Sequence, residues 1–167
     1  MTNIDKYISS YYAEKSSQWW YTFFSFVSHS GSLAVIGTII ICAVYLFYDH
    51  VVLPVTLMIY AELLGLLIII FVRNVIKRNR PRKFRPRLID AWNNYSFPSH
   101  HAYRAFMIAT LLSLFYPAFM SLFYSWAILI GFSRIYLLKH YFSDVLSGAL
   151  LGMFIGVGTF MFMQSYF

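Results

Sequence analysis

The sequence contains very few charged residues and a single cysteine. Only 11% of its 167 residues are Asp, Glu, Lys or Arg, whereas 60% are hydrophobic. This balance is too apolar for an ordinary soluble core, so we expect the lipid bilayer to be the solvent of the protein. Cys42 stands within an apolar run, and one cysteine permits no internal disulfide. The redox compartment therefore cannot be inferred from it.

The sequence also lacks internal repeats, low-complexity linkers and any sign of a second domain. Four segments approach the ~20 apolar residues that cross the hydrocarbon layer as helix. A fifth is shorter and carries Arg104 near its start, but Pro117 would close it like a helix end. The five segments are 32–48, 51–72, 102–116, 118–138 and 145–163. We predict one all-α, polytopic membrane domain over residues 1–167, with about five transmembrane helices.

Two further regions are polar enough to lie outside the spans. Residues 7–31 mix Trp, Tyr and Phe with Lys, Ser, Gln and His, which suits an interfacial helix better than a span. Residues 77–98 contain Pro81, Pro86 and Pro98, which block a continuous helix. We therefore expect an N-terminal interfacial helix, and a loop between the second and third spans.

Residue types that bind phosphate gather in three blocks. The first is a basic run from Arg73 to Pro81, the second is Pro98-Ser99-His100-His101, and the third contains Ser133-Arg134, His140 and Asp144. With five helices crossing alternately, all three blocks emerge on the same membrane face, which is the condition for one site. A lipid that carries phosphate is the expected ligand. We expect membrane lipids as further partners and no nucleic acid, and the sequence predicts no particular oligomeric state.

These blocks resemble the motifs of the integral-membrane type 2 phosphatidic acid phosphatase superfamily. The family pattern is Lys-x6-Arg-Pro, then Pro-Ser-Gly-His, then Ser-Arg-x5-His-x3-Asp. The third block matches in full, whereas Arg73 replaces the usual lysine and His100 the usual glycine. The resemblance implies an enzyme that removes a terminal phosphate from a lipid phosphate or diphosphate through a phosphohistidine. Undecaprenyl diphosphate, phosphatidylglycerol phosphate, phosphatidic acid and lipid A phosphate are the substrates that it suggests.

The resemblance also implies a role for each motif residue. His140 would be the nucleophile and His101 the general acid and then base, with His100 as the alternative acid. If Asp144 follows His140 on the same helix, the four-residue spacing lets it accept the second ring N–H. The phosphate would be bound by arginine side chains, by Ser99 and by backbone amides at a helix start near His100. The arginines are Arg73, Arg80 and Arg134.

Other interpretations of these residues stay open at this point. Two histidines with His140 and Asp144 could hold a metal, but the spacing matches no usual motif and the nearby arginines would repel a cation, so we expect none and no cofactor. Glu62 lies near the middle of the second span, where a hydrogen bond between helices is the favoured role. The remaining basic residues of the loop are expected to anchor at lipid headgroups. They are Arg82, Lys83, Arg85 and Arg87.

Two alternative functions use the same residues. A lipid phosphotransferase would pass the phosphoryl group to another lipid, and a non-enzymatic membrane subunit would only hold headgroups.

Two arguments about orientation in the membrane conflict. All thirteen lysines and arginines are predicted on the motif face, which the positive-inside rule would make cytoplasmic. The resemblance implies a bacterial inner membrane, with a site that faces the periplasm or the outside. We favour the latter because several of these charges are needed to bind phosphate.

Overall fold

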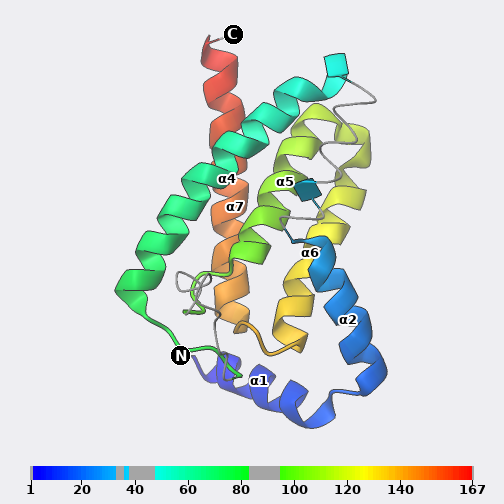
Figure 1. Cartoon of the computed structure of the whole chain (residues 1–167), viewed down its shortest axis with the longest axis vertical. Coiled ribbons are helices and arrows are strands. Elements are labelled where there is room, and N and C mark those ends of the chain that lie inside the picture. The colour runs from blue at the N-terminus through cyan, green and yellow to red at the C-terminus, as the bar shows by residue number, and fades with distance from the viewer. Residues whose placement is uncertain (1, 33–35, 38–47, 83–94, 167) are drawn as a thin grey trace.

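The fold is a bundle of helices (Figure 1). The computed structural model describes residues 2–32, 36–37, 48–82 and 95–166. Those residues contain no strand, which confirms the prediction of an all-α fold. The elements in chain order are α1 (Asn3–Lys15), α2 (Gln18–Ser30), α4 (Tyr48–Ile76), α5 (His100–Phe115), the short 3-10 helix η2 (Pro117–Phe119), α6 (Met120–Tyr136) and α7 (Phe142–Tyr166).

Among the described residues, three helices are long and apolar enough to cross a membrane. They are Val52–Ile76, Pro117–Tyr136 and Phe142–Ser165, and they correspond to three of the predicted spans. α5 corresponds to a fourth, but its 16 residues reach only ~24 Å as helix. It ends just before Pro117, as predicted from the sequence. The first predicted span, 32–48, lies almost entirely outside the described residues.

α5 occupies the centre of the bundle and packs against α4, α6 and α7. Most of its side chains are buried, which explains why a helix of this length needs no lipid-facing surface of its own. Tyr103, Met107 and Leu111 form a cluster with Ile69 of α4 and Ile155 of α7. This packing fixes the start of α5, where the second sequence block lies.

Close contact between α5 and α7 depends on three glycines spaced four residues apart. A Cβ atom on Gly148 would lie 2.4 Å from the carbonyl oxygen of Ser99, and one on Gly152 would lie 2.3 Å from that of Tyr103. On Gly156 it would lie 3.1 Å from the Thr110 Cβ. Small residues at this spacing let two membrane helices approach to backbone contact. α7 therefore holds α5 at a fixed depth.

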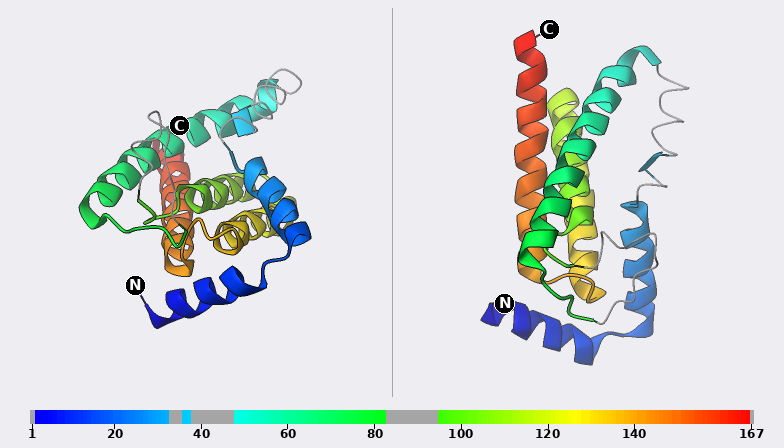
Figure 2. Two further views of the ribbon diagram at one scale, coloured as in Figure 1. Left: turned by 60° about the horizontal axis from the view of Figure 1, so that its bottom comes forward. Right: turned by 60° about the vertical axis from the view of Figure 1, so that its left-hand side comes forward.

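The N-terminal region forms two helices where the composition suggested one. The first ends at Lys15 with Ser16 as its C-cap, and Ser17 caps the second, since its side chain accepts a hydrogen bond from the backbone N–H of Trp20. α2 lies beside α6, whereas α1 crosses the end of the bundle (Figure 2). Phe24 of α2 packs on Tyr136 and Leu137 at the end of α6. Only α1 has the transverse direction expected of an interfacial helix.

Candidate active site

The three sequence blocks meet at the end of the bundle that α1 crosses (Figure 1). The Arg73 guanidinium donates a hydrogen bond to the carbonyl of Pro98, with an Nη2 to O distance of 3.0 Å. Arg80 donates from Nη1 to the carbonyl of Lys139 at 3.2 Å. The backbone N–H of Ser99 donates to the carbonyl of Asp144 at 2.9 Å. Residues far apart in the sequence are thus joined directly, as one site requires.

The start of α5 presents hydrogen-bond donors to this end of the bundle. Ser99 is the N-cap, but its side chain makes no capping bond. Its buried hydroxyl oxygen has no hydrogen-bond partner among the described residues. The amides of the first helical turn lack acceptors within the helix and carry the positive end of its dipole. A hydroxyl and several amides at this position suit an anion.

His140 lies in the turn between α6 and α7 with a defined tautomer. Its Nδ1 is 2.8 Å from the carbonyl oxygen of Ser96. A carbonyl can only accept, so Nδ1 carries the proton and Nε2 keeps its lone pair. Burial lowers the pKa of His140 well below its usual value, and the positive charges of Arg80, Arg134 and Arg73 lower it further. The ring is therefore neutral and has one basic nitrogen, which is the form a nucleophile needs.

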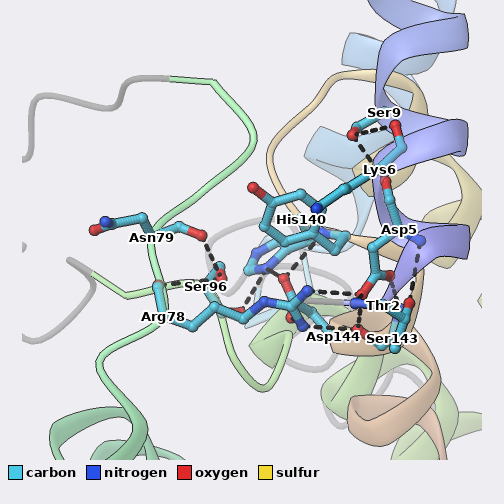
Figure 3. A network of polar contacts seen from close by, with 11 residues as sticks. Thr2, Asp5, Lys6, Ser9, Arg78, Asn79, Ser96, His140, Ser143 and Asp144 are labelled. Carbon is cyan, nitrogen blue, oxygen red and sulfur yellow. Dashed lines mark hydrogen bonds and ion pairs between the residues drawn. The ribbon is translucent and has the colours of Figure 1, made fainter.

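Asp144 is near His140 but does not receive its N–H. The distance from His140 Nδ1 to Asp144 Oδ2 is 3.8 Å, too long for a hydrogen bond. The condition that both residues share one helix is not met, because α7 begins at Phe142, after His140. Asp144 Oδ2 instead accepts from the backbone N–H of Tyr141 at 2.9 Å, and Oδ1 from Arg78 at 2.6 Å. The Ser96 carbonyl takes the orienting role that the sequence reading gave to Asp144 (Figure 3).

Ser96 lies near the end of the predicted loop and is held in place by residues at the start of that loop. Its backbone N–H donates to the carbonyl of Arg78 at 2.8 Å, and its hydroxyl donates to that of Asn79 at 3.1 Å (Figure 3). Residues 77–82 and 95–98, on either side of the undescribed part, contain no helix, as expected. The role of Ser96 could not be predicted from the sequence, because it contributes a backbone carbonyl, which every residue has.

A pocket of about 540 Å³ opens between α2, the start of α5 and the end of α6. His101, Arg134 and Lys139 line one side of it, and α2 lines the other with mostly uncharged polar side chains. Arg134 also donates a hydrogen bond from Nη1 to the hydroxyl of Ser28 on α2. Burial, Arg134 and Arg80 lower the pKa of Lys139 to about 8. Lys139 directly precedes His140 and lines this pocket, which was not predicted from the sequence.

The ring of His100 contacts Glu62 in the bundle interior. His100 Nε2 lies 3.0 Å from Glu62 Oε1, and Arg104 donates to the same oxygen from Nε at 2.9 Å. The expected interhelical hydrogen bond of Glu62 is therefore present, with Arg104 and His100 of α5 as partners. The other carboxylate oxygen, Oε2, is buried and has no hydrogen-bond partner among the described residues. His100 is not among the residues that line the pocket, unlike its neighbour His101.

The loop residues expected at lipid headgroups are described only in part. Lys83, Arg85 and Arg87 lie outside the described residues. Arg82 donates its backbone N–H to the carbonyl of Leu138 at 3.2 Å, which attaches the loop to the turn before His140. Arg78, one of two basic residues between the motif positions Arg73 and Arg80, binds Asp144, a contact that the sequence did not predict.

Taken together, the site offers a neutral basic imidazole, a second histidine on a pocket wall and fixed guanidinium groups. Such groups stabilise the charge that develops on phosphoryl oxygens during transfer. No set of three His, Cys, Asp or Glu side chains in the described parts of the chain is placed to hold a metal ion. Fold and site together define an integral membrane helix bundle with a cluster of arginines and histidines at one end.

The chain belongs to the PAP2 superfamily, which it matches over residues 54–166. Its fold is similar to that of a transmembrane PAP2-type phosphatidylglycerolphosphate phosphatase from Bacillus subtilis, with a TM-score of 0.77 and 24% sequence identity over 98% of this chain and 86% of the other. It is also similar to LpxE from Aquifex aeolicus, with a TM-score of 0.70 and 24% identity over 96% and 99% of the two chains.

Proposed function

We propose that this protein is a membrane phosphatase that removes the terminal phosphate of a lipid phosphate or diphosphate through a phosphohistidine at His140. The hydrogen bond from His140 Nδ1 to the Ser96 carbonyl supports this most directly, because it leaves Nε2 as the basic nitrogen. Membership of the PAP2 superfamily supports the reaction class. The neighbouring arginines supply the positive charge that phosphoryl transfer requires.

In the first step, His140 Nε2 attacks phosphorus and the bond between phosphorus and the lipid oxygen breaks. The negative charge of the bound phosphate favours the protonated form of His101, which then donates its proton to the leaving oxygen. In the second step, His101 takes a proton from water while the water oxygen attacks phosphorus and the N–P bond breaks. Inorganic phosphate leaves and His140 returns to its neutral form. Arg73, Arg80 and Arg134 stabilise the phosphoryl oxygens in both steps.

The substrate headgroup is expected in the pocket beside α2. Its α2 wall carries Gln18, Thr22 and Ser25, which can hydrogen-bond to a headgroup. α2 also exposes Trp19, Trp20 and Phe23, aromatic residues of the kind that prefer the membrane interface. We expect a lipid to place its chains beside α2 and its phosphate between His101 and Arg134. His140 does not itself line the pocket, but both of these residues act electrostatically on its ring. The Bacillus subtilis neighbour is named for phosphatidylglycerolphosphate, which places that lipid first in the panel to be tested.

The burial of the site arginines supports an orientation towards the periplasm or the outside. Arg73 and Arg134 are only 1% and 5% exposed, so they do not anchor at lipid headgroups. Charged residues that are buried in a site carry little weight in the positive-inside rule, because that rule counts residues in short loops. The conflict between charge distribution and family resemblance is weakened accordingly.

The test is release of inorganic phosphate by the purified protein in detergent with EDTA present. The panel contains phosphatidylglycerol phosphate, undecaprenyl diphosphate, phosphatidic acid and lipid A phosphate. We expect turnover of at least one lipid, and loss of turnover in His140→Ala. Phosphate release that requires a second lipid would indicate a phosphotransferase. Binding without turnover, unchanged in His140→Ala, would indicate a non-enzymatic lipid-binding subunit and would overturn the proposal.

A further inference from the structure

Asp5 is the one buried residue of α1, the helix that crosses the end of the bundle. Its side chain reaches the start of α7, where it accepts two hydrogen bonds, and it accepts a third from Arg78 (Figure 3). The Ser143 backbone N–H donates to Oδ1 at 3.0 Å, and the Ser143 hydroxyl donates to Oδ2 at 2.8 Å. Arg78 donates from Nη2 to Oδ2 at 2.7 Å. No part of the proposed reaction so far uses this carboxylate.

Arg78 joins Asp5 to the candidate active site. Its Nη1 donates to Asp144 Oδ1 at 2.6 Å and to the Ser143 hydroxyl at 2.7 Å, while Nη2 binds Asp5. The guanidinium also lies over the ring of Tyr141, with 4.3 Å from Cζ to the ring centroid. These contacts fix the group in one orientation. One guanidinium therefore bridges two carboxylates, one on α1 and one on α7.

Arg78 divides its positive charge between two carboxylates, so it neutralises Asp144 only in part. Arg73 and Arg80 also act on Asp144, and they do so whether or not Asp5 is charged. Asp144 Oδ2 lies 3.8 Å from His140 Nδ1, where a negative charge favours a positively charged ring. His140 becomes positively charged when it carries the phosphoryl group. If Asp5 were neutral, Arg78 would compensate Asp144 more strongly, and the phosphohistidine would be less stabilised.

We propose that Asp5 is a positioning residue for the reaction: by sharing Arg78, it leaves Asp144 its negative charge towards His140 and ties α1 to the active site. This inference rests on the proposed function. It makes the N-terminal helix part of the catalytic apparatus, and predicts that loosening of α1 lowers turnover.

A role in helix capping alone does not explain these contacts. Asp5 does form a capping box with Thr2, with 3.3 Å from Thr2 N to Asp5 Oδ2 and 3.1 Å from Asp5 N to Thr2 Oγ1. A capping box needs only those two bonds and is satisfied at any exposed helix start. Although burial alone would raise the pKa of Asp5, the hydrogen bonds from Ser143 and Arg78 hold it well below its usual value. The carboxylate is thus ionised throughout the neutral range.

The decisive variant is Asp5→Asn, which removes the charge and keeps one side-chain oxygen, enough for either the Ser143 backbone N–H or the donors on the other oxygen. We expect kcat to fall roughly 3- to 30-fold, the range of coupling within one hydrogen-bonded network, with KM for the lipid nearly unchanged. The acidic limb of the kcat/KM profile should move to lower pH, because uncompensated Arg78 disfavours protonation of His140. The other ionisable groups that face His140 stay in place in this variant. They are Arg73, Arg80, His101, Arg134 and Asp144.

Glu14→Gln is the matched control, since Glu14 is an exposed carboxylate on the same helix. It should leave kcat and the pH profile unchanged. Wild-type kcat and an unmoved profile in Asp5→Asn, with His140→Ala inactive, would overturn the inference and leave the proposed function standing. A lower melting temperature with an unmoved pH profile would reduce Asp5 to a helix cap. Absence of turnover in the wild-type protein would instead contradict the proposed function itself.

A second comparison keeps the inference testable if Asp5→Asn folds poorly. Ser143→Ala removes a hydroxyl that contacts both Asp5 and Arg78, and should lower kcat in the same direction. In an Arg78→Gln background, Asp5→Asn should add less than a twofold loss, because Asp5 acts through Arg78. Equal losses of kcat with and without Arg78 would mean that Asp5 acts independently, and would contradict the proposal.

Discussion

At the scale of single residues, the orientation of His140 depends on a backbone carbonyl and not on a carboxylate. The Ser96 carbonyl accepts from Nδ1, whereas Asp144 stands at 3.8 Å. A carbonyl that fixes the tautomer does so whether or not Asp144 is charged. Asp144 therefore contributes mainly through its charge, which stabilises a positively charged ring.

Asp144→Asn should accordingly retain measurable activity. We expect kcat to fall roughly 10- to 100-fold, the range for loss of an outer partner of a catalytic histidine, since the ring keeps its orientation. Phosphate release under single-substrate conditions measures it, with His140→Ala as the inactive reference. If Asp144→Asn is as inactive as His140→Ala, the Ser96 carbonyl is not sufficient to orient the ring.

His100→Gly should stay active without a displaced pH profile. The ring contacts Glu62, whereas the amide at position 100 persists in glycine. We expect the free energy of unfolding to fall, because Glu62 loses His100 and keeps only Arg104 as a partner. Loss of Arg104 should cost more, about 3–5 kcal/mol, since it would leave a buried carboxylate without its charged partner.

Thermal unfolding in detergent, together with the pH dependence of phosphate release, distinguishes these outcomes. His101→Ala should be assayed beside His100→Gly. An active His101→Ala with an inactive His100→Gly would show that the acid is His100.

Lys139 gives the site a pH dependence of its own. Its pKa is lowered to about 8, so the ammonium is charged below that pH and neutral above it. Inhibition by inorganic phosphate should therefore weaken as the pH rises through about 8, because the pocket loses one positive charge. Lys139→Arg keeps the charge at high pH and should abolish this weakening. An identical pH dependence in wild type and Lys139→Arg would exclude Lys139 from anion binding.

At the scale of elements, the depth of α5 in the bundle depends on α7. The carbonyl of Ser99 faces Gly148 and that of Tyr103 faces Gly152, so the first turn of α5 rests directly on the α7 backbone. The same glycine contacts therefore support the turn that we propose to bind phosphate. We expect stability and substrate binding to be linked through this helix pair.

Gly152→Leu should destabilise the protein by about 3 kcal/mol and raise KM, because a side chain there would push α5 away from α7. Gly158→Leu is the control, since a Cβ at Gly158 meets nothing within 4 Å. Urea or thermal unfolding in detergent gives the stability, and lipid titration gives KM. Equal effects of the two substitutions would contradict the packing role of Gly152.

At the scale of the whole molecule, the sequence predicts the elements better than their junctions. Apolar length and proline positions predict the long helices and the end of α5 before Pro117, because these depend on local chemistry. The division of the N-terminal region at Ser17 and the start of α7 after His140 depend on tertiary packing. So does the contact between Glu62 and His100, since it arises where α5 crosses α4.

The same distinction applies to the candidate site. Motif spacing predicts which side chains belong to the site, because the chemistry of each motif residue depends on the type of its side chain. Ser96 contributes a carbonyl, which any residue has, and Asp5 lies 68 residues before the nearest motif position, Arg73. Neither can be recognised in one sequence without coordinates. Lys139 could have been recognised, since it directly precedes His140.

The bond between Ser96 and Arg78 closes the loop at its base. The distance from the Ser96 N to the Arg78 O is 2.8 Å, so this hydrogen bond holds both ends of the intervening segment together within the site. The position of the Ser96 carbonyl, and with it the tautomer of His140, therefore depends on a contact between residues 18 positions apart in the chain. We expect a chimaera with residues 83–94 of a relative to keep phosphate release, provided that Arg78 and Ser96 are retained.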